Sequence, residues 1–169
     1  MERPNAVTLK NNPLTLVGPE LKAGDPAPDF TVTDVNLAPV NLSAFKGKIK
    51  VFLAVHSLDT PVCETETRRF NQEAANLGDI SIVVVSVDLP FAQKRFCAAA
   101  GIDKVTTLSD YKDRSFGTAY GTYIKELGLL SRAVFVVNAE DKITYAEYVP
   151  EASNHPDYDA ALLHLKQEI

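Results

Sequence analysis

The sequence predicts an α/β fold with a central mixed β-sheet flanked by helices, extended at the N-terminus by a β-hairpin. Two observations predict it. Val51–Val55 and Ile80–Val87 are continuous uncharged runs of mainly apolar residues, which are typical of sheet strands buried on both faces. The segments that follow these runs have apolar residues at helical spacing, as expected of helices that connect parallel strands.

The first fifty residues are expected to form short strands. Val7–Leu9 and Thr15–Val17 flank the turn sequence Lys10–Pro13, which predicts a hairpin over about residues 7–17. The prolines of Gly24–Asp29 predict a loop, because each one fixes its own φ and restricts the residue before it. Two strands and a helical corner are then expected at Phe30–Thr33, Val40–Leu42 and Leu42–Gly47.

Two helices are expected in the middle of the chain, Glu64–Leu77 and Pro90–Ala100. The first has apolar residues at helical spacing, namely Phe70, Ala74 and Leu77. The second begins at a proline and is followed by Gly101, two signals of helix ends. Its apolar stripe is expected to consist of Ala92, Phe96 and Ala99.

The last third is expected to end in an antiparallel pair and a helix. A short strand and a weak helix come first, at Thr106–Leu108 and Ser115–Tyr120. Ala133–Val137 and Ile143–Tyr148 follow as strands joined by a turn, and Asp157 caps a final helix over Tyr158–Glu168. A βαβ core followed by such a pair and a last helix is thioredoxin-like topology. Without repeats or a linker, residues 1–169 are expected to form one domain.

Composition excludes several functional classes. The 17 basic and 22 acidic residues give a net charge of −5, and no basic run is present to neutralise a nucleic-acid backbone. The apolar runs are far shorter than the roughly 20 residues of a membrane span. No secretory signal follows Met1, and two cysteines are typical of a reducing compartment, so a cytoplasmic location is expected.

Cys63 is the first candidate for chemistry. It lies between a buried strand and the expected start of a helix, at the sheet edge where open α/β folds place their sites. The free N–H groups of a helix N-terminus favour an anion, and a cysteine thiolate is such an anion. A small buried apolar residue is the alternative interpretation of a free cysteine. Position alone does not decide between the two.

Cys97 is the second cysteine, 34 residues further along the chain and inside the expected helix Pro90–Ala100. This spacing excludes a Cys-x-x-Cys dithiol site. No metal site is expected either, because the cysteines form no cluster of the usual ligand spacing with His56, His155 and His164. Taken alone, Cys97 is expected to be a core residue.

Five segments together resemble the thiol peroxidase subfamily of the peroxiredoxins, the bacterial atypical two-cysteine type. Ser57–Cys63, with the sequence SLDTPVC, resembles the peroxidatic-cysteine loop with its Thr-x-x-Cys motif. Asp88–Cys97, DLPFAQKRFC, is similar to the resolving-cysteine helix, and Ser131–Val137 to the arginine-bearing strand. Leu9–Leu16 and Pro156–Ala161 resemble the N-terminal hairpin and the last helix. The resemblance covers nearly the whole chain in the right order.

The resemblance implies a thioredoxin-like fold and an antioxidant peroxidase that reduces hydrogen peroxide and organic hydroperoxides to water and alcohols. It assigns the peroxidatic role to Cys63 and the resolving role to Cys97, with an intrachain disulfide that thioredoxin reduces. It also implies a homodimer and neither a cofactor nor a metal. Because both cysteines are expected in helices, at least one helix end is expected to loosen before they join.

Two further residues gain a role from the resemblance. Thr60 is expected to donate a hydrogen bond to the peroxide or the sulfur, and Arg132 to favour the thiolate and hold the peroxide. Helix-opening N–H groups near Val62 and Cys63 are expected to stabilise the developing oxyanion. The alternatives are a helix cap for Thr60 and a solvated surface residue for Arg132.

The sequence departs from the subfamily pattern at two places. The proline that opens the family loop is His56 here, and the segment Tyr120–Ser131 is shorter than usual. His56 is either a pH-sensitive neighbour of the Cys63 pocket or, as the favoured interpretation, a histidine bonded to the backbone at a strand end. His155 and His164 are expected on the surface.

Two other functional classes remain open on sequence grounds. One is a disulfide exchanger or redox sensor that uses Cys63 and Cys97 without turning over peroxide. The other is a binding or structural protein on the same fold, with both cysteines merely buried.

Overall fold

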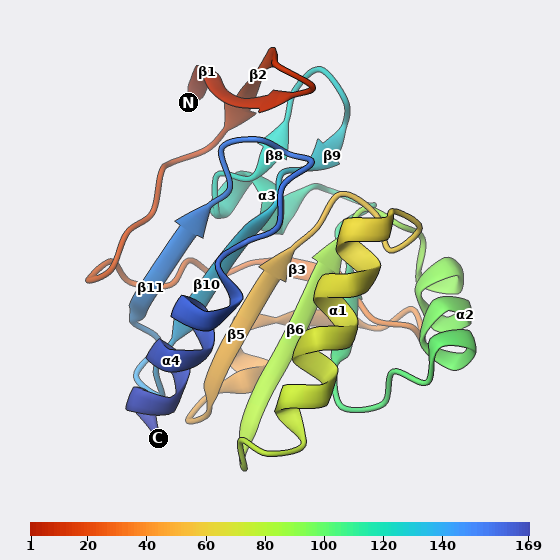
Figure 1. Cartoon of the computed structure of the whole chain (residues 1–169), viewed down its shortest axis with the longest axis vertical. Coiled ribbons are helices and arrows are strands. Elements are labelled where there is room, and N and C mark those ends of the chain that lie inside the picture. The colour runs from red at the N-terminus through yellow and green to blue at the C-terminus, as the bar shows by residue number, and fades with distance from the viewer.

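The computed structural model describes residues 1–169, apart from the side chain of Ala74, so the expected place of that side chain on an apolar helix face lies outside the described residues. The central sheet has seven strands in the order β11-β10-β5-β6-β7-β3-β4 (Figure 1). Their bounds are β3 Thr31–Thr33, β4 Pro39–Asn41, β5 Ile49–Ala54, β6 Ile80–Ser86, β7 Thr106–Ser109, β10 Ala133–Val137 and β11 Ile143–Tyr148.

The sheet is mixed, as predicted. β5, β6 and β7 run parallel to one another. β10 is antiparallel to β5, β11 to β10, β3 to β7 and β4 to β3. The β10–β11 pair has the bounds predicted from the sequence.

A smaller, four-stranded sheet lies at one end of the central sheet, in the order β1-β2-β8-β9 (Figure 1). Its strands are β1 Glu2–Leu9, β2 Asn12–Val17, β8 Tyr123–Ile124 and β9 Leu129–Leu130. The predicted hairpin is confirmed and begins at Glu2. β8 and β9 were not predicted, because two-residue strands carry no alternation and are defined by pairing with each other and of β8 with β2.

Five helical segments complete the fold: η1 Leu42–Phe45, α1 Pro61–Ala74, α2 Pro90–Ala100, α3 Ser115–Ala119 and α4 Tyr158–Glu168. α2 and α4 have the predicted bounds, and the Asp157 carboxylate caps α4 by accepting from the Ala160 N–H. α1 begins three residues earlier than predicted. Pro61 occupies its first position, where a proline costs no hydrogen bond and already has a helical φ.

The predicted stripe of α2 is wrong in part. Ala99 is exposed, and the side chain that is fully buried is Gln93, at 0 % exposure. The Gln93 amide donates to Ser86 Oγ at 3.1 Å and to the Leu108 carbonyl at 2.9 Å. A polar residue therefore anchors this helix to β6 and β7, which hydrophobic spacing alone did not predict.

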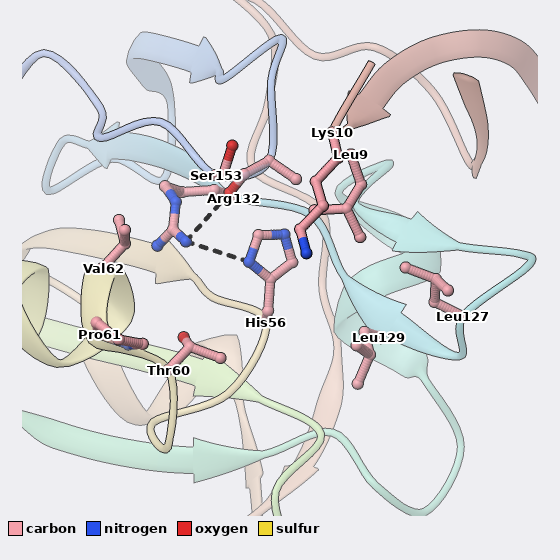
Figure 2. A pocket seen from close by; sticks show the side chains of 11 residues that line it. Leu9, Lys10, His56, Thr60, Pro61, Val62, Leu127, Leu129, Arg132 and Ser153 are labelled. Atoms are coloured by element: carbon pink, nitrogen blue, oxygen red, sulfur yellow. Dashed lines mark hydrogen bonds between the residues drawn. The ribbon is translucent and has the colours of Figure 1, made fainter. Parts of the chain in front are cut away.

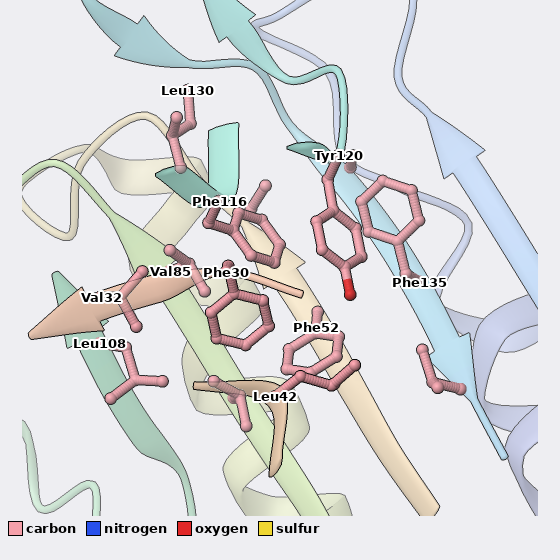
Figure 3. Close-up of a cluster of buried hydrophobic side chains, with 14 of the residues drawn as sticks. Phe30, Val32, Leu42, Phe52, Val85, Leu108, Phe116, Tyr120, Leu130 and Phe135 are labelled. Carbon is pink, nitrogen blue, oxygen red and sulfur yellow. The ribbon is translucent and has the colours of Figure 1, made fainter. Parts of the chain in front are cut away.

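The central sheet separates two apolar clusters, because successive side chains of a strand point to opposite faces. On β5, Phe52 and Ala54 face one cluster while Val51 and Leu53 face the other. The first cluster is rich in aromatic rings (Figure 3), with Phe116 and Tyr120 stacked at 4.3 Å between centroids. The second lies under α1 and α4 and contains Cys63.

None of the helices in the described part of the chain is long and apolar enough to cross a membrane.

Candidate active site

Cys63 lies in the first turn of α1, with its side chain fully buried at 0 % exposure. The turn begins after β5, so the sulfur is held at the carboxyl edge of the parallel strands. Thr60, the N-cap residue, makes no side-chain cap hydrogen bond. The N–H groups of Val62 and Cys63 are consequently free of a helix partner.

Arg132 contacts the sulfur directly. It precedes β10, is only 1 % exposed, and donates from Nη1 to Cys63 Sγ at 3.1 Å. Burial alone disfavours its charge, but the charges of Cys63 and Glu66 and hydrogen bonds to both outweigh burial and raise the pKa of Arg132. The alternative of a solvated surface arginine is therefore wrong.

Glu66 shares the same nitrogen of Arg132. It lies on α1 one turn after Cys63, is 0 % exposed, and its Oε2 accepts from Arg132 Nη1 at 2.9 Å. Burial raises its pKa from 4.5 to about 7, although the charge of Arg132 and its hydrogen bond act in the opposite direction. Glu66 was not predicted from the sequence as a site residue. The spacing of three residues from Cys63, which puts both on one helix face, was the available signal.

His56 contacts the other terminal nitrogen of the guanidinium, Nη2. Arg132 Nη2 lies 3.1 Å from His56 Nδ1 and donates to the Ala152 carbonyl at 3.3 Å (Figure 2). Because arginine has no acceptor, Nδ1 must accept and the proton of the neutral ring sits on Nε2. Burial, helped by the charge of Arg132, lowers the pKa of His56 to about 4. The favoured expectation of a backbone-bonded histidine is thus wrong, because the ring pairs with the side chain of Arg132, just before β10.

Asp88 holds the loop between β5 and α1. Its carboxylate accepts from Ser57 Oγ at 2.7 Å and from the Leu58 N–H at 2.8 Å, and it also accepts from Ser86 Oγ at 2.8 Å. The loop that carries Thr60 is in this way tied to the end of the neighbouring strand β6.

Thr60 lies beside this network, but its side chain makes no hydrogen bond to Asp88. Its hydroxyl donates to the Ser57 carbonyl at 2.7 Å. The side chain occupies the N-cap position without acting as a cap, so the helix-cap alternative does not describe it either. Its oxygen faces the pocket described next.

A pocket of about 460 Å³ opens over these residues (Figure 2). Its polar lining is formed by Lys10, His56, Thr60, Ser153 and Arg132. Its apolar lining is formed by Leu9, Pro61, Val62, Leu127, Leu129 and Ala152. Leu127 and Leu129 belong to the short segment between Tyr120 and Ser131, which therefore forms one wall of the pocket. Cys63 lies beneath this lining, next to Val62 and Arg132.

Cys97 lies on α2 in different surroundings. It is half-buried, and its Sγ is 3.8 Å from Thr107 Oγ1. Both cysteines are free thiols. It lines a separate pocket with Ile102 and Val105. Burial raises the pKa of the Cys97 thiol, against the hydrogen bond with Thr107.

The remaining histidines lie apart from this site. His155 is exposed and its Nδ1 is 2.6 Å from the Tyr158 hydroxyl, whereas His164 is half-buried against Tyr145. Within the described side chains, no group of three or more His, Cys, Asp or Glu residues is arranged to hold a metal ion.

Comparison with known proteins decides the family. The Redoxin family model matches residues 22–162. The chain belongs to the Redoxin family. It is 60% identical over 161 residues to the thiol peroxidase of Oceanobacillus iheyensis, covering 95% of this chain and 98% of the relative. It is 56% identical over 153 residues to the thiol peroxidase of Bacillus subtilis, covering 90% and 92%. The chain is thus a peroxiredoxin-type peroxidase of the thiol peroxidase subfamily, as the resemblance predicted.

Solved structures agree on the fold. A peroxiredoxin-like protein from Aquifex aeolicus superposes with a TM-score of 0.91 at 45% identity over 98% of both chains. The thiol peroxidase from Chromobacterium violaceum has a TM-score of 0.85 at 23% identity over 95% of both chains, which supports the fold alone. The predicted thioredoxin-like fold is confirmed.

Of the predicted site residues of this peroxiredoxin, Cys63 and Arg132 are in contact and Thr60 lies at the same pocket. Cys97 lies away from them on another helix. An anion at Cys63 faces a fixed positive charge and free N–H groups, an arrangement that favours a thiolate and can stabilise a leaving oxyanion.

Proposed function

We propose that Cys63 is the nucleophile through which this peroxidase reduces peroxides. The Cys63 thiolate attacks one peroxide oxygen, a sulfur–oxygen bond forms, and the oxygen–oxygen bond breaks. The products are a Cys63 sulfenic acid and, after protonation of the leaving oxygen, water or an alcohol. The observation that carries the proposal is the 3.1 Å contact from the buried Arg132 guanidinium to Cys63 Sγ.

Arg132, Thr60 and the first-turn amides supply the remaining functions. The guanidinium favours the thiolate and attracts the peroxide oxygens. The Thr60 hydroxyl exchanges its bond to the Ser57 carbonyl for one to the peroxide, and the N–H groups of Val62 and Cys63 stabilise the developing oxyanion. Because the sulfur has no exposed surface, the side chains above it must move aside to admit the substrate.

Cys97 is proposed to resolve the sulfenic acid within the same chain. The thiol of Cys97 condenses with it to a disulfide and releases water. The two sulfurs start in different helices and one is fully buried, so the first turn of α1 or the end of α2 unwinds to bring them together. An external dithiol, thioredoxin, then restores both thiols by exchange.

The pocket supports both hydrogen peroxide and organic hydroperoxides as substrates. Its apolar lining, which includes Leu9 and Leu129, suits an alkyl group, while Arg132 suits the peroxide end. The chain is proposed to act as one domain in a reducing compartment, the cytoplasm, in antioxidant defence and redox homeostasis.

A coupled assay tests this function. Peroxide-dependent oxidation of NADPH in the presence of thioredoxin and its reductase is expected with hydrogen peroxide and with alkyl hydroperoxides. Disulfide transfer without peroxide consumption would instead identify an exchanger. Cysteines that react with labels only after denaturation would identify an inert binding protein.

A homodimer is also proposed, as the resemblance implies. Leu89 and Phe91, at the start of α2, are 52% and 66% exposed, which supports an apolar contact there. Sedimentation at micromolar concentration is expected to detect a species of twice the 18.4 kDa chain mass. A chain-mass species alone would contradict the proposal.

A further inference from the structure

We propose that Glu66 holds a proton while Cys63 is a thiolate and releases it when Cys63 becomes a sulfenic acid, so that oxidation of this site takes up no net proton. The inference rests on the proposed nucleophilic role of Cys63. Glu66 contacts Arg132 rather than the sulfur, so it acts on the reaction through the guanidinium.

The geometry sets two anions against one cation. Cys63 Sγ and Glu66 Oε2 are 3.1 and 2.9 Å from the same nitrogen, Nη1 of Arg132. All three side chains are at most 1 % exposed, so water does not screen the repulsion between the two acceptors. Two ionised acceptors on one buried nitrogen would leave the site with one negative charge in excess. The arrangement is neutral when only one of them is ionised.

Arg69 on α1 lies over the Tyr158 ring but pairs with Glu73 and Asp159, so Arg132 is the cation that acts on Glu66. His56, on the other nitrogen of Arg132, is neutral near pH 7, since burial lowers its pKa to about 4. Tyr158 on α4 is also neutral, because burial raises its pKa to about 12. Glu147 on β11 adds a negative charge that further raises the pKa of Glu66. The neighbours therefore favour a proton on Glu66.

The structure also indicates which oxygen carries the proton. Oε2 accepts the hydrogen bond from Arg132, whereas Oε1 is buried with no partner among the described residues. A proton on Oε1 leaves the Arg132 contact intact. Nη1 can then serve both Glu66 and the thiolate without a structural change.

Oxidation of Cys63 reverses this preference. When the thiolate attacks ROOH, the sulfur is oxidised to the neutral sulfenic acid and the peroxide is reduced to the alkoxide or hydroxide, which takes one proton to become ROH. The Cys63 thiolate, the anionic partner of Arg132, has then disappeared, and Glu66 ionises to become the new anionic partner. Thiolate, ROOH and the Glu66 acid become sulfenic acid, ROH and the Glu66 carboxylate, with one negative charge before and after.

Proton uptake during single-turnover oxidation tests the inference. Cys97→Ser, which stops the reaction at the sulfenic acid, is mixed with hydrogen peroxide in weak buffer containing a pH indicator dye. The measurement covers about pH 5 to 9, and the effect is confined to the interval below the raised Glu66 pKa of about 7, because above it Glu66 is ionised in both states. We expect uptake well below one proton per sulfenic acid in that interval.

Glu66→Gln in the same background removes the ionisable group at nearly constant shape and is expected to take up one proton at every pH at which Cys63 is a thiolate. Glu64→Gln is the matched control, because Glu64 is an exposed carboxylate on the same helix. It is expected to behave like the parent. Identical uptake curves for the parent and Glu66→Gln would overturn the inference.

Two further readouts keep the outcome decisive. Trapping with dimedone counts the sulfenic acid in each sample, so absence of sulfenic acid in the parent refutes the proposed function instead. Infrared difference spectra of the unmutated protein are independent of whether Glu66→Gln folds. We expect a protonated carboxyl band in the reduced protein that disappears on oxidation, and an unchanged band would overturn the inference.

Discussion

Cys63 and Cys97 carry the same thiol in two different surroundings. Cys63 is fully buried at a helix N-terminus and receives a hydrogen bond from a buried arginine. Cys97 is half-buried in the last third of a helix, where its thiol forms a hydrogen bond with the Thr107 hydroxyl. Burial raises the pKa of Cys97, and the hydrogen bond with Thr107 offsets this loss of hydration only in part.

The difference teaches that burial alone does not decide the chemistry of a cysteine. Cys63 is the more buried of the two, yet it is the one that faces Arg132 and free N–H groups. A thiol that stays protonated is suited to condense with a sulfenic acid that has already formed, rather than to attack the peroxide itself. The two sites therefore support a division into attacking and resolving roles.

The largest expected effect comes from replacing each of the two cysteines by serine, one at a time. Cys63→Ser is expected to lose peroxidase activity completely, because no sulfenic acid can form. Cys97→Ser is expected to consume about one equivalent of peroxide and then stop with thioredoxin, leaving a sulfenic acid that excess peroxide oxidises to the sulfinic acid. Stopped-flow peroxide consumption and mass spectrometry measure both.

Non-reducing gels complete this test. Oxidised wild type is expected to migrate as a more compact monomer held by a Cys63–Cys97 bond. A covalent dimer would mean that the resolving thiol comes from a second chain. Cys63 and Cys97 would then act together across an interface between two chains.

Removal of the cation is expected to make Cys63 resemble Cys97. Arg132→Met should slow the second-order reaction with hydrogen peroxide by about 10²- to 10³-fold, because a smaller fraction of Cys63 is thiolate and the oxyanion loses a donor. Arg68→Met is the matched control, since Arg68 is an exposed arginine on α1. Unchanged kinetics for Arg132→Met would show that the 3.1 Å contact has no catalytic role.

Glu66 should make the stability of this region depend on pH. Its pKa is raised from 4.5 to about 7, so between these values the folded protein binds more protons than the unfolded chain, and the unfolding free energy falls as pH rises. Glu66→Gln removes this contribution. Its unfolding free energy relative to wild type is expected to increase by up to about 1.4 kcal/mol per pH unit across that window.

Urea unfolding from pH 4.5 to 7.5, about the range of that window, measures the effect. His56 acts with the opposite sign, because its lowered pKa makes the unfolded chain bind more protons between about 4 and 6.5. It is present in both proteins, so comparison with wild type isolates Glu66. A difference that does not change with pH would contradict the raised pKa.

The smallest expected effect concerns the orientation of Arg132. His56→Leu removes one of the two acceptors of Nη2 and should slow peroxide reduction by about two- to tenfold, the equivalent of about 0.5–1.5 kcal/mol for a typical hydrogen bond, because the Ala152 carbonyl remains. His56→Asn places an acceptor near the position of Nδ1 and is expected to stay closer to wild type. Equal rates in all three proteins would mean that Glu66 and the Ala152 carbonyl suffice to orient Arg132.

The sequence by itself determined most of the elements and the place of Cys63, the proposed nucleophile. β10, β11, α2 and α4 have their predicted bounds, and Cys63 lies at a helix start as expected. These features depend on apolar periodicity, prolines and caps, which are properties of residues close together in the chain. The family loop and the resolving-cysteine segment could be identified for the same reason, since each is a short continuous motif.

Only the tertiary structure decided which side chains lie around the Cys63 sulfur. Arg132 is 69 positions from Cys63 and 76 from His56, and nothing local to any of them specifies the contacts. The burial of Glu66, the partner of His56, the Gln93 anchor of α2 and the β8–β9 strands likewise follow from the packing of distant segments. Charge at this site depends on distance and on exclusion of water, and both exist only once α1 and β10 have come together.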